Sequence, residues 1–221
     1  MSGAVAEPLL VLTIGQGPRP DIAAELAEVL GEQPLEIRGA LDGLSVEQIL
    51  RLAPIDDADH LHTRLQGAHD AVVSKVAVAE RLNDLLDEAG PRPVVVACTG
   101  RFRDLPRRPN VLYPSEVLAH LVAAVLPPDS TVGVLVPLPE QVEPFERQWT
   151  TPHRRAIGTA VMPGGDVGAA AATFEAEGVD LVLLDCFGYD RSTLEQVRAS
   201  CSAPVLSAVR CTGHLVRELL G

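Results

Sequence analysis

Short apolar runs alternate with amphipathic stretches along the whole chain. Residues 8–14 (PLLVLTI) are apolar at nearly every position, which is typical of a strand that is buried on both faces. A polar loop at 15–20 follows this run. Apolar residues at helical spacing then predict a helix from about Asp21, and Gly31 suits its left-handed C-terminal cap. The chain therefore opens with a strand, a loop and a helix.

Capping residues place two further helices in the first half. Ser45 and Gln48 have the spacing of a capping box, so a short helix is expected there. A longer helix is predicted between Ser74, as its N-cap, and Gly90, as its C-terminal stop. This helix leads into an apolar strand that ends at Cys98.

The same order of elements returns in the second half. Residues 131–137 (TVGVLVP) form another apolar strand, a polar loop is expected at 138–144, and a later apolar run ends at Cys186. The helices of this half are expected to begin at three capping residues, Ser115, Asp166 and Ser192. A strand at 203–209 and a helix at 213–220 close the chain.

This alternation of strands and helices predicts an α/β fold with parallel sheets. Because the two halves resemble each other, we expect two α/β lobes related by a pseudo-two-fold axis. Residues 1–114 and 204–221 are assigned to the first lobe, since the last strand and helix are expected to fold back onto it. Residues 115–203 are assigned to the second lobe.

Composition narrows the class of protein. The chain has 18 Lys and Arg against 30 Asp and Glu, and its formal charge of −12 disfavours a nucleic-acid partner. No apolar run is long enough to span a membrane, and the N-terminus lacks the basic segment of a signal peptide, so a cytoplasmic protein is expected. Its four cysteines are then free thiols, and none has the spacing of a zinc site, so no metal is expected.

Two of the four cysteines stand where binding sites form in such folds. Ligands bind beyond the carboxyl ends of parallel strands, which is where Cys98 and Cys186 are expected. Backbone amides after each thiol would lower its pKa and hold the oxygens of a carboxylate. These amides belong to Thr99, Gly100, Phe187 and Gly188. A lone strand-end cysteine is more often simple packing, and we interpret Cys201 and Cys211 as structural.

Two thiols that face each other across one cleft would have a chemical use. One thiolate removes a proton from the carbon next to a carboxylate, and the other thiol returns a proton on the opposite face. The same pair would serve racemisation, isomerisation, or decarboxylation followed by protonation, and the residues leave this choice open. They also leave open a protein that only binds an anionic metabolite, and hydrolysis by one cysteine with His214.

Five more side chains near these loops are candidates for substrate binding, namely Gln16, Arg19, Lys75, Gln141 and Tyr189. Arg19 is able to bind a carboxylate through two hydrogen bonds, although an ordinary surface arginine fits its position equally well. Lys75 would reach the cleft or remain solvated at the start of a helix. Tyr189 would offer a phenol to the pocket or pack in the core.

Four residues allow two interpretations each. Arg101 would either clamp a ligand or point to water. Strand alternation turns Asp185 away from the face of Cys186, where it would cap a neighbouring helix rather than act as a base. His60 and His62 have no third ligand at metal spacing, so a polar strand edge explains them better than a metal site.

Several segments together resemble the AroM family. They are LTIGQGPRPD at 12–21, VSK at 73–75, ACTG at 97–100, VGVLVPLPEQ at 132–141 and LVLLDCFGYD at 181–190. This family looks like a branch of the aspartate/glutamate racemase superfamily, which comprises cofactor-independent racemases, isomerases and decarboxylases. The resemblance implies two Rossmann-like lobes, an active site between them with one catalytic cysteine from each lobe, no cofactor, and a homodimer. By position, Cys98 and Cys186 match those two cysteines.

The chain departs from amino-acid racemases at the motifs that recognise an α-amino group. Their Cys-Asn-Thr is replaced by Cys98-Thr99-Gly100, and their Gly-Cys-Thr-His by a segment that begins Asp185-Cys186-Phe187. The expected substrate is therefore a small carboxylate other than glutamate or aspartate. The expected function is a cofactor-independent racemase or isomerase with two-cysteine acid/base chemistry, and the alternatives are a decarboxylase and a non-catalytic binding protein.

Overall fold

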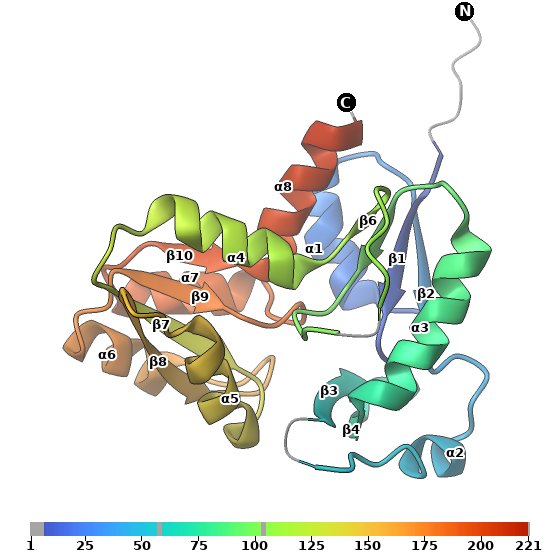
Figure 1. Cartoon of the computed structure of the whole chain (residues 1–221), viewed down its shortest axis with the longest axis horizontal. Helices are drawn as coiled ribbons and strands as arrows, with labels where there is room; N and C mark the ends of the chain where they lie inside the picture. Colours follow the sequence, from blue (N-terminus) through green and yellow to red (C-terminus); the bar gives the residue numbers. More distant parts are fainter. Residues whose placement is uncertain (1–6, 57–58, 103–104, 221) are drawn as a thin grey trace, which may run out of the picture.

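Two parallel sheets form the framework of the molecule (Figure 1). The computed structural model describes residues 7–56, 59–102 and 105–220. In the first sheet the strand order is β2-β1-β5-β6, and every neighbouring pair is parallel. Its strands are β1 (Leu9–Thr13), β2 (Leu35–Gly39), β5 (Val94–Val96) and β6 (Val111–Leu112).

The second sheet repeats this order strand for strand. Its order is β8-β7-β9-β10, again with parallel neighbours throughout. Its strands are β7 (Ser130–Val136), β8 (Arg154–Ala160), β9 (Leu181–Leu184) and β10 (Val205–Ser207). Thus β7 takes the place of β1, β8 that of β2, β9 that of β5 and β10 that of β6. The α/β fold with parallel sheets that the sequence predicts is confirmed.

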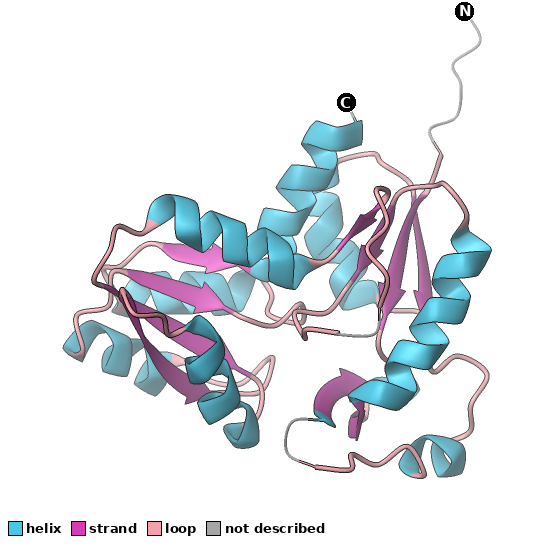
Figure 2. Ribbon diagram, in the orientation of Figure 1, coloured by secondary structure: helices cyan, strands magenta, loops and turns pink. Residues whose placement is uncertain are grey.

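Helices cover the sheets, and two of them cross from one half to the other (Figures 1 and 2). Helix α4 (Pro114–Val125) follows the first sheet, and its buried residues Leu118 and Val122 belong to an apolar cluster that contains strand residues of both sheets. Helix α8 (Ala208–Leu220) follows the second sheet and packs against α1 (Pro20–Leu30) and α4. The other helices are α2 (Val46–Leu50), α3 (Lys75–Ala89), α5 (Pro139–Trp149), α6 (Gly168–Ala176) and α7 (Arg191–Ser200). Among the helices of the described ranges, none is long and apolar enough to cross a membrane.

The crossing of α8 bears on the assignment of residues 204–221 to the first lobe. Helix α8 does lie against α1 of the first half. Strand β10, however, pairs with β9 in the second sheet, so the expectation is wrong for this strand. The reason is the repeat itself, because β10 is the edge strand that corresponds to β6. The lobe boundary near residue 115 stays a prediction.

Several local signals act as predicted. The Ser45 hydroxyl accepts a hydrogen bond from the Gln48 amide, and the Gln48 side chain accepts one from the Ser45 amide, which completes the capping box of α2. Ser74 caps α3 by accepting a hydrogen bond from the Ala77 amide. Gly90 follows α3 with a φ of 64°, a conformation that favours glycine over other residues.

The start of α4 and the start of α5 differ from prediction. Proline opens both helices, at Pro114 and Pro139, because a residue of the first turn needs no amide hydrogen for the helix. Ser115 is therefore a buried residue of the first turn rather than the cap. Residues 138–144, expected as a loop, form the cap and first half of α5.

Two other caps lie next to the predicted residues. Asp190 caps α7 in place of Ser192, since its carboxylate accepts hydrogen bonds from the amide and hydroxyl of Thr193. The N-cap of α6 is Val167, while the Asp166 carboxylate accepts a hydrogen bond from the Gly168 amide. Aspartate competes with serine for such amides, and spacing alone does not decide between them.

A small hairpin stands apart from both sheets (Figure 2). It consists of the antiparallel strands β3 (His60–Arg64) and β4 (Asp70–Ser74), joined through the short 3-10 helix η2 (Gln66–Ala68). Leu61, Leu65 and Val73 of the hairpin belong to the core cluster that also contains β1, β5 and α3. The hairpin is thereby fixed to the first sheet near the ends of β1 and β5.

Candidate functional site

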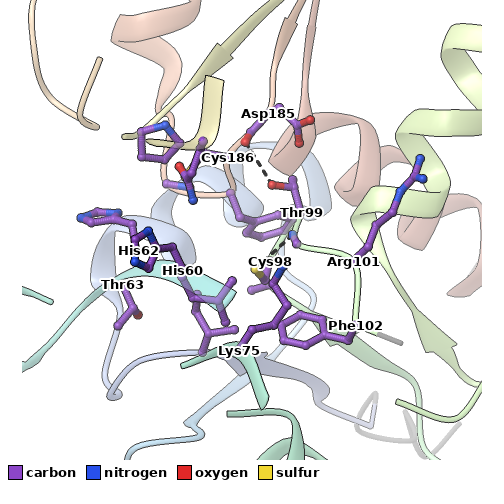
Figure 3. A pocket seen from close by; sticks show the side chains of 18 of the residues that line it. His60, His62, Thr63, Lys75, Cys98, Thr99, Arg101, Phe102, Asp185 and Cys186 are labelled. Carbon is purple, nitrogen blue, oxygen red and sulfur yellow. Dashed lines mark hydrogen bonds between the residues drawn. The ribbon is translucent and has the colours of Figure 1, made fainter. Parts of the chain in front are cut away.

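A cavity of about 590 Å³ lies at the carboxyl ends of the strands and is lined by both halves of the chain (Figure 3). The first half contributes the segment after β5 and the β3–β4 hairpin, and the second half contributes the segment after β9 and part of α5. A cavity of this size is typical of a small-molecule site. Its place agrees with the rule for ligands on parallel sheets.

Cys98 and Cys186 both line this cavity, from equivalent turns of the two sheets. Cys98 follows β5, and Cys186 follows its counterpart β9. In each turn the amide two residues later, that of Gly100 or Gly188, donates a hydrogen bond to the sulfur at 3.3 Å. A Cβ at Gly100 would lie 3.3 Å from the Cys98 sulfur and 3.1 Å from Leu61, so glycine permits the close turn.

The thiols are held in their protonated form at neutral pH. Burial raises the pKa of Cys98 to about 12 and that of Cys186 to about 11, against the smaller lowering effect of the Gly100 and Gly188 amides. The expected lowering of both pKa values is therefore wrong. The amides and nearby cations act in the predicted direction, but removal of the sulfurs from water outweighs them.

The end of β9 joins the two cysteine turns to each other. The Thr99 hydroxyl donates to the carbonyl oxygen of Asp185 at 3.0 Å, which links the residue after Cys98 to the residue before Cys186 (Figure 3). The Asp185 carboxyl group accepts a hydrogen bond from Trp149 Nε1 at 2.7 Å. Burial raises the pKa of this carboxyl to about 7, although Trp149 and Thr99 lower it.

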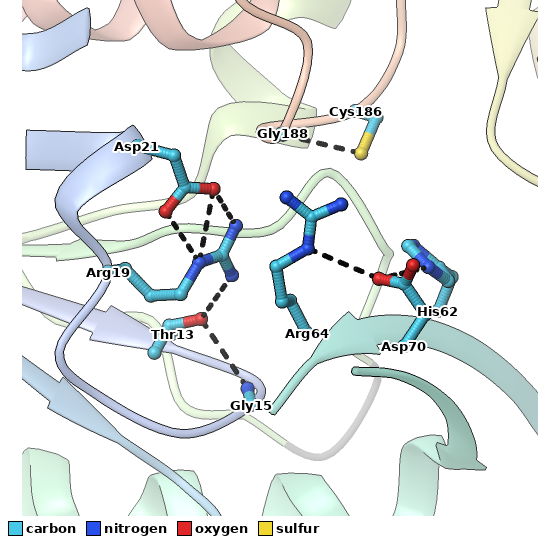
Figure 4. Close-up of polar contacts among 9 residues, drawn as sticks. All are labelled: Thr13, Gly15, Arg19, Asp21, His62, Arg64, Asp70, Cys186 and Gly188. Atoms are coloured by element: carbon cyan, nitrogen blue, oxygen red, sulfur yellow. Dashed lines mark hydrogen bonds and ion pairs between the residues drawn. The ribbon is translucent and has the colours of Figure 1, made fainter. Parts of the chain in front are cut away.

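Cations approach each thiol from a different element. Lys75, at the start of α3, favours the ionised form of Cys98. Arg19 and Arg64 favour the ionised form of Cys186. The Arg19 guanidinium donates to both oxygens of Asp21 and to the Thr13 hydroxyl (Figure 4). Arg19 therefore lines the cavity as half of an ion pair.

Most of the predicted substrate-binding residues meet at the cavity. Its lining includes Arg19, Lys75, Thr99, Gly100, Gln141, Phe187 and Gly188, together with Arg101 and Asp185. Gln141 uses its side-chain oxygen to accept a hydrogen bond from the Leu138 amide at the start of α5. The amides of Thr99 and Phe187 donate to no other residue within the described ranges, so they are available to a ligand.

Comparison with known proteins identifies the family to which the chain belongs. The model of the AroM protein family matches residues 9–220. The chain belongs to the AroM family. Among solved structures, this AroM chain is similar to unliganded arylmalonate decarboxylase, with 13% identity, 97% of this chain and 93% of that chain covered, and a TM-score of 0.49. A comparison with curated proteins gives no match.

Two predicted site residues of this AroM chain lie outside the cavity lining. Gln16 is buried, and its side chain donates to the carbonyls of Leu41 and Leu44 and accepts from the Gln66 amide. Tyr189 is fully buried and donates its hydroxyl to the Val161 carbonyl. Both side chains hold loops and strands together, so their predicted assignment to substrate binding is wrong.

The β3–β4 hairpin supplies site residues that the sequence analysis did not select. His60, His62, Thr63 and Arg64 all line the cavity. Nε2 of His62 lies 3.2 Å from Asp70, and burial lowers the pKa of His62. The alternation of buried and half-buried positions in HLHTR is the signal for a strand, in agreement with the interpretation of His60 and His62 as a polar strand edge. No group of three or more metal-binding side chains occurs among the residues described.

Proposed function

We propose that this AroM protein is a cofactor-independent enzyme that moves a proton at the carbon beside a carboxylate, with Cys98 and Cys186 as its acid and base. The observation that supports this proposal is a pair of thiols that line one cavity from equivalent turns of the two sheets. Racemisation and isomerisation both follow from such a pair. The substrate is a small anionic carboxylate.

In the proposed reaction one sulfur is a thiolate and the other is a thiol. The thiolate takes the proton from the α-carbon, and the electron pair of that C–H bond moves into the carboxylate as an enediolate. The opposite thiol then gives its proton to the other face of the carbon, so the two sulfurs exchange roles. The free amides of Thr99 and Phe187 would hold the negative oxygens of the intermediate. Lys75, Arg19 and Arg64 favour the thiolate.

Proton exchange with solvent tests this function directly. In deuterated water, the wild-type protein is expected to exchange the α-proton of at least one member of a panel of small carboxylic acids. Cys98→Ala and Cys186→Ala are each expected to abolish interconversion of the two enantiomers and to limit exchange to the enantiomer that faces the remaining sulfur, because each removes one of the two groups. Cys211→Ala, which changes a cysteine of α8 outside the cavity, is the matched control and should retain both interconversion and exchange. Full exchange in either cavity variant would overturn the two-thiol scheme.

Decarboxylation is the second candidate, and the raised thiol pKa values favour it. Loss of carbon dioxide leaves a carbanion without the help of a base, and a neutral thiol then donates the proton. Thiol-dependent carbon dioxide release should therefore be nearly independent of pH from 7 to 10, and fall as the thiol ionises near its pKa of about 11 to 12. Exchange that needs a thiolate should instead rise about tenfold per pH unit over the same range. The two slopes, measured on the same acids, separate the candidates.

A further inference from the structure

Arg64 brings an unpaired set of donors to the cavity wall. It is the last residue of β3, and its guanidinium extends toward the turn of Cys186 (Figure 4). Its Nε lies 3.3 Å from the Asp70 carboxylate, to which it donates. Its two terminal nitrogens donate to no acceptor in the part of the chain that the structure describes. Two nitrogens of one planar group therefore face the cavity side by side.

Arg19, the neighbouring arginine, lacks this capacity. Its Nε and one terminal nitrogen donate to Asp21 at 2.9 and 2.6 Å, and its other terminal nitrogen donates to Thr13 at 3.4 Å. An arginine binds a carboxylate most strongly through two adjacent N–H groups. On Arg19 these groups are occupied, whereas on Arg64 they remain available to a ligand.

The hairpin and the loop after β1 hold Arg64 from two sides. Asp70 accepts a hydrogen bond from its side chain across the β3–β4 pair. The backbone carbonyl of Arg64 accepts a hydrogen bond from the Gln16 amide. A Cβ on Gly15 would overlap this carbonyl oxygen, so glycine lets the loop approach the end of β3 closely. The backbone of Arg64 is thereby held in place, and its hydrogen bond to Asp70 restricts the guanidinium before an anion binds, which lowers the entropic cost of binding.

A ligand of the proposed enzyme would meet two separate sets of donors. The free amides of Thr99 and Phe187 belong to the thiol turns, where the reacting carboxylate is proposed to lie. Arg64 belongs to a different element and faces the cavity on the Cys186 side. Arg64, Thr99 and Phe187 all line the same cavity, and its volume of about 590 Å³ is sufficient for a small molecule with two carboxylates.

We infer that Arg64 binds a second carboxylate of the substrate through its two terminal nitrogens, so that the substrate is a dicarboxylic acid. This inference rests on the proposed function, in which the first carboxylate lies beside the reacting carbon. It assigns to the β3–β4 hairpin the selection between acids with one and with two carboxylates.

The test compares acids of equal chain length that carry one or two carboxylates. Calorimetric titration of the full chain uses malonate, succinate, glutarate and adipate, each paired with propionate, butyrate, valerate or hexanoate. The wild-type protein is expected to bind at least one diacid about tenfold or more tightly than its monoacid partner. Arg64→Met is expected to remove that preference. Arg64→Lys is expected to keep part of it, because lysine retains the charge but not the paired donors.

Arg38→Met is the matched control. Arg38 also ends its side chain in an ion pair, with Glu88, and its exposure of 34% is close to the 30% of Arg64, but it lies outside the cavity lining. This variant should keep the diacid preference. A wild-type protein without any diacid preference would overturn the inference. So would an Arg64→Met protein that binds diacids as before, or that loses monoacids and diacids equally.

Failure of the inference and failure of the proposed function give different results. If Cys98→Ala and Cys186→Ala still interconvert the enantiomers while the diacid preference depends on Arg64, the two-thiol scheme fails and the binding site stands. If both cysteine variants lose this interconversion while Arg64→Met leaves binding unchanged, the inference alone fails.

Discussion

Asp185 shows how strongly burial changes the chemistry of one residue. Its side chain is 1% exposed, and one carboxyl oxygen accepts a hydrogen bond from Trp149. The other oxygen has no partner among the residues that the structure describes. Because a charge is costly in such surroundings, the pKa of Asp185 rises to about 7. Strand alternation indicated that this side chain turns away from the thiol, but sequence does not reveal how dry its surroundings are.

This shift makes the stability of the protein depend on pH. The folded-state pKa of about 7 lies above the ordinary value of 3.8, so Asp185 favours folding below pH 4 relative to neutral pH. As the pH rises from 4 to 7 the unfolded chain ionises first, and the folded state loses about 4 kcal/mol from this residue. Asp185→Asn removes the titration, so its stability relative to wild type should rise by about that amount between pH 4 and pH 8.

Urea unfolding at a series of pH values measures this difference. Asp180→Asn, which changes an exposed aspartate at the other end of β9, is the matched control. An Asp185→Asn protein whose stability keeps the same pH profile as wild type would contradict the assigned pKa.

The sequence does not reveal how deeply a side chain is buried, and this also explains which properties of the two thiols could be predicted. Position at the end of an apolar strand was enough to select Cys98 and Cys186, because strand ends meet at one edge of a parallel sheet. The direction of the pKa shift was wrong, because it depends on how many protein atoms surround each sulfur. That number is a property of the folded molecule and leaves no local pattern.

At the scale of elements, the β3–β4 hairpin is the part of the site that sequence analysis identified least well. Regular periodicity predicts long helices and buried strands, such as α3 and β7, with little error. The hairpin strands are short and polar, and their position over the cavity depends on contacts with the loop after β1. Arg64 was therefore missed, while Gln16, which fixes that loop through three hydrogen bonds, was mistaken for a ligand contact.

Gly15→Ala tests how closely the loop and the hairpin must approach. The new methyl group would overlap the Arg64 carbonyl oxygen and the Thr63 hydroxyl, so the hairpin must shift. We expect a loss of about 1–3 kcal/mol in the free energy of unfolding, typical of overpacking, together with a weaker diacid preference. Thermal unfolding and the same calorimetric titrations measure the two effects.

Gly17→Ala is the control for this change in the same loop. There the nearest atom to a new Cβ, the carbonyl oxygen of Ile37, lies at 3.4 Å, an ordinary contact distance. Equal effects of the two substitutions would show that loop flexibility, rather than close approach, explains the result for Gly15.

At the scale of the whole molecule, the sequence predicted the repeat of the two halves. It predicted only in part which half the elements α4, β10 and α8 pack against. Each half carries its own strand and cysteine pattern, and the two sheets follow the same strand order. The exchange of α4 and α8 between the halves rests on one apolar cluster that joins both sheets, and such contacts between remote segments leave no sequence signal. The homodimer that the family resemblance implies remains a proposal for measurement in solution.

The bond between Trp149 and Asp185 gives the protein an optical probe of its own. Trp149 is the single tryptophan of the chain, and its indole N–H donates to Asp185, a carboxyl group with a pKa of about 7. Fluorescence from the native sequence, without any label, thus reports the electrostatic state of the layer behind Cys186. An acid that enters the cavity and changes the surroundings of Asp185 is expected to change the tryptophan emission. Fluorescence titration with a panel of acids is therefore a direct way to screen for the natural substrate.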